Sequence, residues 1–365
     1  FDDSANGLVP SEGAGVVVLK RFSRAVADGD HIYGVIRASR ISHSGTGAGQ
    51  FMPNIRVMAD TAAEGIADAG IAIEDLGYIE SHGTGTELGD PIELTALANA
   101  MRRSTEATGL CAIGSKANIG HMEAASGLGS LIKVLLSMRH GEIAPCAKLR
   151  HVNASFDTAR SPFYFPQTAV AWPKNSRGTR VAGINSFGMG GSNAFVVLES
   201  YEPEAQTRPA PEASVVFALS ARSTEGLRRY ASTVDAFLRA RRDDGLSPSS
   251  LADFAYVTQT GRMAWRHRLA VVARDVDEAI AALDAWRNAP EQRSDTVFAE
   301  DIESATAQDT LRLLGGDAGA GFVASLIEAR QFDRLAELWV RGAQVDWAAL
   351  HRDCPRRRAP FPSAP

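Results

Sequence analysis

Residues 82–91 read HGTGTELGDP and follow directly on the apolar run Leu76–Glu80 (LGYIE). The run is short, carries β-branched and aromatic side chains and stops at a glycine-rich turn, as a buried strand does. Pro91 then stands where a helix over Ile92–Met101 would begin, because proline is accommodated in the first turn of a helix. This stretch therefore predicts a strand, a turn and a helix in succession, with His82 at the carboxyl end of the strand.

The segments on either side of this stretch alternate between strand and helix patterns. Strands are expected at Gly15–Leu19, Ile32–Ala38, Cys111–Ser115, Val181–Asn185 and Ala194–Glu199, and helices at Met58–Ala69 and Ala124–Arg139. Gly70 follows the first of these helices, at the position that favours a left-handed cap. Alternating strands and helices predict an α/β domain over residues 1–200.

The composition changes after residue 200. Residues 201–212 (YEPEAQTRPAPE) contain three prolines and no periodicity, which is typical of a linker. Residues 213–350 predict a small second α/β domain, in which the stretch 290–320 is weakly patterned and expected to be partly loop. Its expected elements are a strand at Val215–Leu219, a helix after Ser223, a strand at Leu269–Ala273 and a helix after Asp275. The tail 351–365 is rich in proline and arginine and is expected to form no regular element.

The bulk composition excludes several classes of protein. The 365 residues have a formal net charge of -5, which argues against a nucleic-acid binder because such a protein needs a basic face. The three cysteines, Cys111, Cys146 and Cys354, are far apart and form no CxxC pair, so neither a disulfide framework nor a thiolate zinc site is indicated. No apolar run approaches the ~20 residues of a membrane span. We expect a cytoplasmic protein and, because the chain opens at Phe1 without an initiator methionine, a fragment boundary at that residue.

Two of the eight histidines lie in glycine-rich turns directly after expected strands. His82 opens HGTGT, and His121 closes KANIGH, residues 116–121. A neutral imidazole in such a turn can donate a hydrogen bond to a carbonyl oxygen or act as a base. A third glycine-rich segment, NSFGMGGSN at residues 185–193, can bring backbone N–H groups close to an oxyanion.

Other interpretations of the histidines stay open on the pattern alone. Either side chain could be a hydrogen-bonded residue of a turn or core. A phosphate-binding loop is disfavoured because HGTGT lacks the Gly–Lys–Ser/Thr ending of a P-loop and is not a GxGxxG segment. A zinc site is disfavoured because no second His or Cys stands at ligand spacing. The pattern by itself indicates a site for acyl or carbonyl chemistry.

Four segments, in order, resemble the β-ketoacyl synthase domains of modular polyketide synthases. They are FDDSANGLVPSEGAGVVVLK, ESHGTGTELGDPIE, IGSKANIGHMEAASG and GINSFGMGGSNAF, and they cover most of residues 1–200. The resemblance implies a thiolase-like fold, in which two similar α/β halves build a five-layered αβαβα homodimer, and makes residues 1–200 the C-terminal part of the domain. It implies no metal or dissociable cofactor, since the substrates are carried on the phosphopantetheine of an acyl carrier protein.

The same resemblance implies roles for individual residues. The triad of the family is a cysteine and the histidines of HGTGT and NIGH, here His82 and His121, with Lys116 as the supporting lysine. The implied substrate-binding residues are Thr84 and Thr86, which hydrogen-bond the pantetheine arm, together with Phe187 and Met189, the latter also lending an N–H to the oxyanion hole. The implied reaction is decarboxylative Claisen condensation of an acyl thioester with a malonyl-carrier-protein thioester, which elongates a polyketide chain.

The nucleophilic cysteine of the family lies upstream of the FDD segment, so we expect it upstream of Phe1. Neither Cys111, in a strand, nor Cys146, after a proline, is expected to replace it, because a reactive thiol needs an electropositive and accessible setting. The chain alone is therefore expected to be inactive and to need the upstream part of the ketosynthase.

Three further positions depart from the family pattern. The residue that the family has between Ser115 and Lys116 is absent, and a one-residue loss in a strand turns later side chains to the other face. Phe195 stands in place of a histidine, and Ser11 in place of a glycine. These departures put the aim of Lys116 and full activity in doubt rather than the family.

The rest of the chain resembles the linker domain that follows polyketide ketosynthases. The segments that carry this resemblance are VVFALSARSTEGLRRYA, SLADFAYVTQTGRMAWRHRLAVVA and WVRGAQVDWAAL. No acyltransferase sequence separates this domain from the tail, which resembles the trans-acyltransferase class and implies a free-standing acyltransferase as a further partner. Two alternatives are a non-catalytic scaffold or docking segment and a non-condensing ketosynthase, and the presence of both His82 and His121 favours the condensing enzyme.

Overall fold

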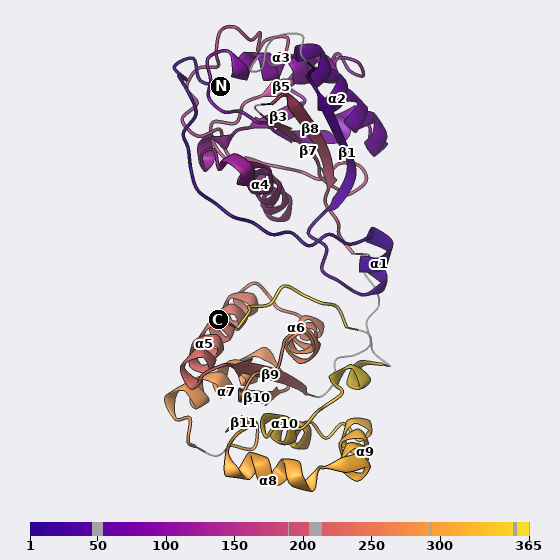
Figure 1. Ribbon diagram of the computed structural model, residues 1–365, viewed down its shortest axis with the longest axis vertical. Helices are drawn as coiled ribbons and strands as arrows, with labels where there is room; N and C mark the ends of the chain where they lie inside the picture. Colours follow the sequence, from indigo (N-terminus) through magenta and orange to yellow (C-terminus); the bar gives the residue numbers. More distant parts are fainter. Residues whose placement is uncertain (46–53, 189, 204–213, 293, 353–355, 365) are drawn as a thin grey trace. The chain divides into compact units, whose positions relative to one another are not determined.

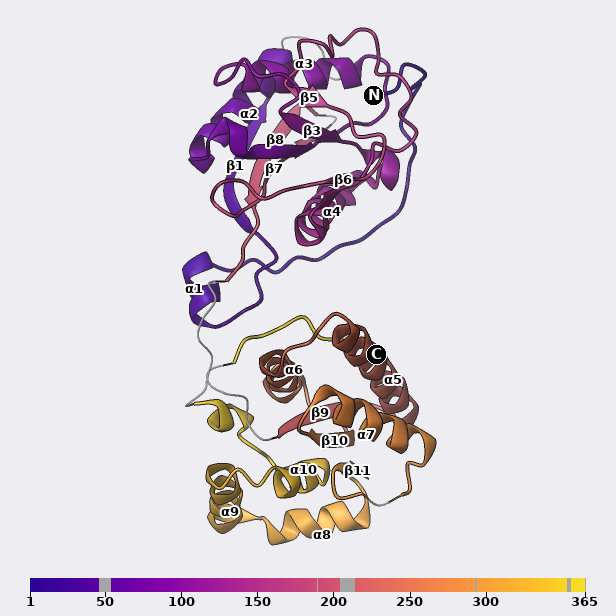
Figure 2. The same cartoon turned by 180° about the vertical axis from the view of Figure 1, so that it is seen from behind.

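The computed structural model describes residues 1–45, 54–188, 190–203, 214–292, 294–352 and 356–364 (Figures 1 and 2). The chain divides into two compact units. The first unit comprises residues 1–22 and 32–204, and the second unit comprises residues 23–31 and 205–365. Each unit has its own sheet and its own core.

A mixed sheet forms the centre of the first unit, with the strand order β1–β8–β7–β2–β3–β5. Its strands are β1 (Val35–His43), β2 (Leu76–Glu80), β3 (Cys111–Gly114), β5 (Phe163–Tyr164), β7 (Val181–Phe187) and β8 (Ser192–Glu199). β8 is antiparallel to both β1 and β7, whereas β7, β2, β3 and β5 are parallel neighbours. The parallel strands therefore end at the same edge of the sheet.

Helices cover both faces of this sheet, as Figures 1 and 2 show. α2 (Ile55–Ala69) and α3 (Gly89–Met101) pack on one face, and α4 (Ser126–His140) packs on the other. Successive side chains of a strand point to opposite faces, so Ile79 is buried on the α3 side and Tyr78 on the α4 side. α2 begins where the Asn54 side chain accepts the N–H groups of its first turn and ends at Gly70, whose φ of 61° is left-handed, as the sequence predicts.

The remaining elements of the first unit are short. They are η1 (Ile73–Asp75), η2 (Lys116–Asn118), η3 (Glu123–Ala125), β4 (Glu142–Ile143) and β6 (Val170–Ala171). α1 (Phe22–Ala27) belongs to the second unit except for its first residue. β4 and β6 pair with each other outside the main sheet.

The strand expected at Gly15–Leu19 is not formed, and that prediction is wrong. The segment has no strand neighbour among the described residues, and Val16 and Val18 are 90% and 92% exposed. An apolar, β-branched run becomes a strand only where another strand completes its hydrogen bonds. The strand expected at Ile32–Ala38 does form, but it begins later and runs on to His43 as β1.

Phe195, which departs from the family pattern, is a core residue of the first unit. Its side chain is fully buried on β8 and lies against Gly65 of α2 and Gly183 of β7. A Cβ atom at either glycine would come within 3.0 Å or less of the Phe195 ring. The two glycines thus make the space that the large aromatic side chain fills.

The second unit has a three-stranded antiparallel sheet in the order β11–β10–β9. Its elements are β9 (Val215–Ala221), α5 (Thr224–Asp243), α6 (Pro248–Thr260), β10 (His267–Ala273), α7 (Val276–Asn288), β11 (Val297–Asp301), α8 (Ala305–Leu313), α9 (Gly316–Glu328), α10 (Phe332–Val340) and η4 (Trp347–His351). α5, α6 and α7 pack on the face that carries Phe217 and Leu219, and α9 and α10 on the face that carries Val216. The expectation that 290–320 is partly loop is confirmed: residues 290–292, 294–296, 302–304 and 314–315 lie outside helices and strands, and the rest of the described stretch forms β11, α8 and the start of α9.

The tail of the chain packs on this second unit. Residues 356–364 contain no helix or strand, yet Phe361 is buried among the rings of Phe217, Phe237 and Phe254. The hydroxyl of Tyr230 donates to the backbone oxygen of Pro362 at 3.1 Å. The tail is therefore held by packing rather than by regular backbone hydrogen bonds.

Candidate active site

Three glycine-rich turns meet at one edge of the first unit's sheet. They follow β2, β3 and β7, which are adjacent parallel strands. Turns at the carboxyl ends of neighbouring parallel strands share one crevice. His82, His121 and Phe187, which come from three separate parts of the sequence, are brought together in this way.

The two histidine rings lie 5.4 Å apart between centroids and are perpendicular to each other. Both line a cavity of about 880 Å³, which Thr84, Thr86 and Phe187 also line. Of the predicted catalytic and substrate-binding residues, Met189 lies outside the described residues. The other predicted binding residues share one cavity with both histidines.

The proton of His121 is placed by the backbone of the following turn. Its Nδ1 accepts the backbone N–H of Glu123 at 2.9 Å and lies 3.0 Å from the Ser126 hydroxyl oxygen. A backbone N–H can only donate, so Nδ1 must be an acceptor and the ring proton sits on Nε2. Glu123 has a left-handed φ of 52°, which is uncommon for a residue other than glycine and turns its N–H toward the ring.

The backbone of His121 is fixed by the segment at residues 9–11. Its N–H donates to Val9 O at 2.8 Å, and its carbonyl oxygen accepts the N–H of Ser11 at 2.9 Å. Because both hydrogen bonds use only the main chain, serine in place of glycine at position 11 leaves them in place.

His82 has the same arrangement at its ring. Its Nδ1 lies 3.4 Å from the backbone N–H of Phe187 and 3.4 Å from the Lys116 ammonium, so both neighbours are donors and Nε2 carries the proton. Burial, then the charge of Lys116, then His121, lowers the pKa of His82 to about 3. Burial and the charge of Lys116 also lower the pKa of His121. Both imidazoles are therefore neutral N–H donors near neutral pH.

Lys116 is directed at His82 and not at His121. Its ammonium donates to the backbone oxygen of His82 at 2.5 Å, and the residue is only 5% exposed. Burial lowers the pKa of this lysine. The absence of a residue before Lys116 has not removed its side chain from the site.

Glu93 is a site residue that the sequence analysis missed. Its carboxylate accepts the backbone N–H groups of His82 and Gly83 at 2.7 and 2.8 Å and the side-chain amide of Asn185 at 2.7 Å. It is buried on α3, and burial raises its pKa to about 7 against the lowering effect of these hydrogen bonds. The available signal was an acidic residue inside the otherwise apolar helix Ile92–Met101.

The two described cysteines are poor nucleophiles. Cys111 lies inside β3 and is fully buried, and burial raises the pKa of its thiol. Cys146 donates to the backbone oxygen of Ile113 at 2.9 Å, and burial raises its pKa to about 11. A thiol acts as a nucleophile as its thiolate, which neither environment favours. Cys354 lies outside the described residues.

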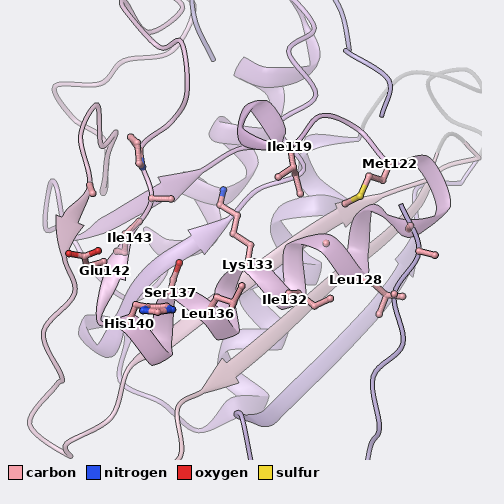
Figure 3. Close-up of a pocket in the computed structure, with 17 residues that line it drawn as sticks. Ile119, Met122, Leu128, Ile132, Lys133, Leu136, Ser137, His140, Glu142 and Ile143 are labelled. Carbon is pink, nitrogen blue, oxygen red and sulfur yellow. The ribbon is translucent and has the colours of Figure 1, made fainter. Parts of the chain in front are cut away.

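A second hollow, of about 550 Å³, follows α4 (Figure 3), and neither His82 nor His121 lines it. We call it the α4 groove; its main apolar lining is Ile119, Met122, Leu128, Ile132 and Leu136, with Lys133 among them.

Among the described side chains, no group of three or more His, Cys, Asp or Glu residues is placed to hold a metal ion. In the part of the chain that the structure describes, no helix is both long and apolar enough to cross a membrane.

Two family models and a number of known proteins match this chain. Residues 33–150 match the family described as "Beta-ketoacyl synthase, C-terminal domain", and residues 215–283 match "CurL-like, PKS C-terminal". The polyketide synthase PksL of Bacillus subtilis (strain 168) is 35% identical over 377 aligned residues, which include all of this chain and 8% of PksL.

Two solved structures cover the whole chain. The ketosynthase from module 6 of the bacillaene synthase of Bacillus subtilis 168 is similar with a TM-score of 0.89 and 36% identity, and 63% of that protein is covered. The oxazolomycin ketosynthase domain of Streptomyces albus JA3453 is similar with a TM-score of 0.82 and 37% identity, and 59% of it is covered. This chain thus spans about three fifths of the solved ketosynthases and a small part of PksL.

The fold is the thiolase-like fold of these solved ketosynthases. The chain belongs to the β-ketoacyl synthases of polyketide synthases: it carries the C-terminal domain of that family, followed by the C-terminal region found after polyketide ketosynthases.

Proposed function

We propose that this chain serves, within a complete ketosynthase, in polyketide chain elongation by decarboxylative Claisen condensation. The observation that carries the proposal is the pair of neutral imidazoles whose Nδ1 atoms both face donors, which leaves two Nε2–H groups on one cavity. Two such donors can bind one developing oxyanion.

In the proposed reaction, the growing chain is first held as a thioester of a cysteine. A malonyl thioester then loses CO₂ by breaking its C–C bond, and the electron pair forms an enolate whose oxygen accepts hydrogen bonds from His82 and His121. The enolate carbon attacks the acyl carbonyl carbon, a new C–C bond forms, and the cysteine leaves as a thiolate. No redox partner or metal is needed for this electron balance.

The other residues of the site have supporting roles in this proposal. Lys116 holds the backbone of His82 and adds to the effect of burial, which lowers the pKa of His82 and keeps its imidazole neutral. Glu93 accepts backbone N–H groups of the same turn. Thr84 and Thr86 line the cavity beside the histidines, which supports a role in binding the pantetheine arm. Phe187 shapes the cavity wall, and an oxyanion role for the N–H of Met189 is proposed from the family resemblance alone.

We place the nucleophile on a cysteine outside residues 1–365, because the surroundings of Cys111 and Cys146 disfavour a thiolate. The proposed partners are an acyl carrier protein, the remaining ketosynthase segment and a second copy of the complete domain. A free-standing acyltransferase is a further proposed partner. No acyltransferase sequence separates the second unit from the tail, whose Phe361 packs on the core of that same unit.

The experiment is to supply the complete ketosynthase with an acyl pantetheine thioester and a malonyl carrier protein and to identify products by mass spectrometry. A β-ketoacyl product together with CO₂ is expected. Acyl transfer without a new C–C bond would identify a non-condensing ketosynthase, and no acylation at all would identify a scaffold or docking segment; either result would contradict the proposal.

A further inference from the structure

A buried lysine outside the cavity contacts the turn that carries Lys116. Lys133 extends from α4 with its stem along the α4 groove (Figure 3). Its ammonium lies 2.8 Å from a carboxylate oxygen of Glu80 and donates at 3.1 Å both to the backbone oxygen of Ser115 and to the side-chain oxygen of Asn118. An ammonium group has three donors, and here three acceptors surround it.

Two of these acceptors lie at the two ends of η2, the turn Lys116–Asn118. Ser115 is the residue directly before the turn, and Asn118 is its last residue. The Asn118 amide is oriented by its own hydrogen bond to Pro145 O at 2.9 Å, which leaves its oxygen free to face Lys133. One ammonium group thus spans the turn from which Lys116 reaches the His82 carbonyl.

The third acceptor anchors this arrangement in the sheet. Glu80 ends β2, two residues before His82, and is 1% exposed. The hydroxyl of Tyr78 donates to the same carboxylate oxygen that faces Lys133. On the neighbouring strand β3, a Cβ atom at Gly114 would collide with both the Tyr78 hydroxyl and the Glu80 carboxylate. The sheet is therefore built to admit a charged group at this point.

From this geometry we propose that Lys133 is a positioning residue for the reaction: it clamps the turn Lys116–Asn118 at both ends and thereby holds Lys116 against His82. The proposal rests on the proposed function, because it assumes that the contact of Lys116 with His82 matters for condensation. If Lys133 served only to neutralise Glu80, it would not need its contacts to Ser115 and Asn118. These two contacts therefore distinguish a clamp from a simple buried ion pair.

The test uses the complete ketosynthase with three variants. Lys133→Met combined with Glu80→Gln removes both buried charges together, because loss of one partner would leave the other buried without its counter-charge. Asn118→Ala removes one end of the clamp and leaves the ion pair intact. Lys174→Met is the control, since Lys174 forms a surface ion pair with Glu202 in the same unit.

Two measurements are made on each folded variant. The first is labelling of Lys116 by an amine-specific reagent, located by mass spectrometry, which needs no turnover. The second is the rate of CO₂ release compared with the rate of acyl loading. Release of Lys116 from its buried position is expected to raise its labelling in both clamp variants above that of the unchanged enzyme and of Lys174→Met, because local opening exposes groups that the closed state protects. CO₂ release is expected to fall by up to about 100-fold, the effect of a misplacement of about 1 Å, with acyl loading nearly unchanged.

Lys116 that stays protected in both folded clamp variants would overturn the proposal. Equal losses of CO₂ release and acyl loading, with lowered thermal stability, would also overturn it and leave Lys133 a structural residue. Labelling of Lys116 without loss of CO₂ release would contradict the role of Lys116 in the proposed function, while the clamp itself would stand. If the double variant does not fold, Asn118→Ala decides between these outcomes.

Discussion

Replacing His82 or His121 by alanine in the complete ketosynthase should slow CO₂ release by about 10²–10³-fold, the cost of one oxyanion-hole donor. Each ring offers one Nε2–H to the cavity, because each Nδ1 faces a backbone N–H. The pKa of each histidine is lowered, so both rings are neutral donors at pH 7. At about 1.4 kcal/mol per factor of ten, the expected loss is about 3–4 kcal/mol of transition-state stabilisation for each variant.

The double variant should be much less than additive, since either single change already leaves a half-formed donor pair. Acyl loading is measured separately, by the mass increase of the enzyme with an acyl pantetheine thioester and no malonyl substrate. We expect it to change little, because acylation of the cysteine uses a different oxyanion site. Lys174→Met again serves as the control.

Equal losses in acyl loading and CO₂ release would refute this reasoning. The two imidazoles would then hold the three turns together rather than bind an enolate. Full additivity of the two single losses would count against a shared oxyanion, because independent roles multiply their effects on the rate.

Three further outcomes are expected. Burial, with the charge of Lys116, lowers the pKa of His82 to about 3 from an ordinary value of 6.5, so the unfolded state binds more protons at this residue below pH 6.5. The contribution of His82 to stability should therefore fall by about 2 kcal/mol between pH 7.5 and 5, whereas Glu93, whose pKa burial raises to about 7, acts in the opposite direction; urea titrations of the complete ketosynthase and of His82→Phe at both pH values give the His82 contribution as the difference between the two proteins. The 365-residue chain alone should bind a hydrophobic dye strongly, because Val16, Val18 and the α4 groove are exposed; a sharp melting transition without dye binding would contradict this. Cys111 and Cys146 should resist alkylation by iodoacetamide and take up no acyl group in the folded chain, since burial raises both pKa values; a stoichiometric adduct on either would place the nucleophile inside this chain.

The meeting of the two histidines is predicted only through the family resemblance, which makes both members of one triad. The structure supplies the physical reason: His82 follows β2, His121 lies in the turn after β3 and η2, and turns after neighbouring parallel strands lie at one edge of the sheet. The Nδ1 contacts of His121 could not be predicted in the same way, because they depend on the left-handed φ of Glu123, a conformation that its residue type does not favour.

Two differences between the sequence analysis and the structure have separate physical causes. Gly15–Leu19 has the composition of a buried strand, but composition does not supply the neighbouring strand that hydrogen bonding requires. In α8 the described side chains include one buried residue, Ala307, so the apolar stripe that predicts a helix is faint. Glu93 was overlooked because its partners are backbone N–H groups 10 and 11 positions away, which no short pattern reveals.

Relative to the family pattern, one residue is missing between Ser115 and Lys116, and the structure explains why the position of the Lys116 side chain tolerates this loss. A one-residue loss inside a strand would turn the following side chains to the other face, but β3 ends at Gly114, and the loss falls between the strand and η2. Beyond the last ladder hydrogen bond, direction is set by the contacts of the turn, and these are the bonds of Ser115 O and Asn118 to Lys133. The functional atom of Lys116 lies at the end of a flexible four-carbon side chain, which can absorb a small backbone shift and still reach the carbonyl of His82. A histidine side chain is shorter and cannot absorb such a shift. Consistent with this, the spacing from Lys116 to His121 matches the family pattern.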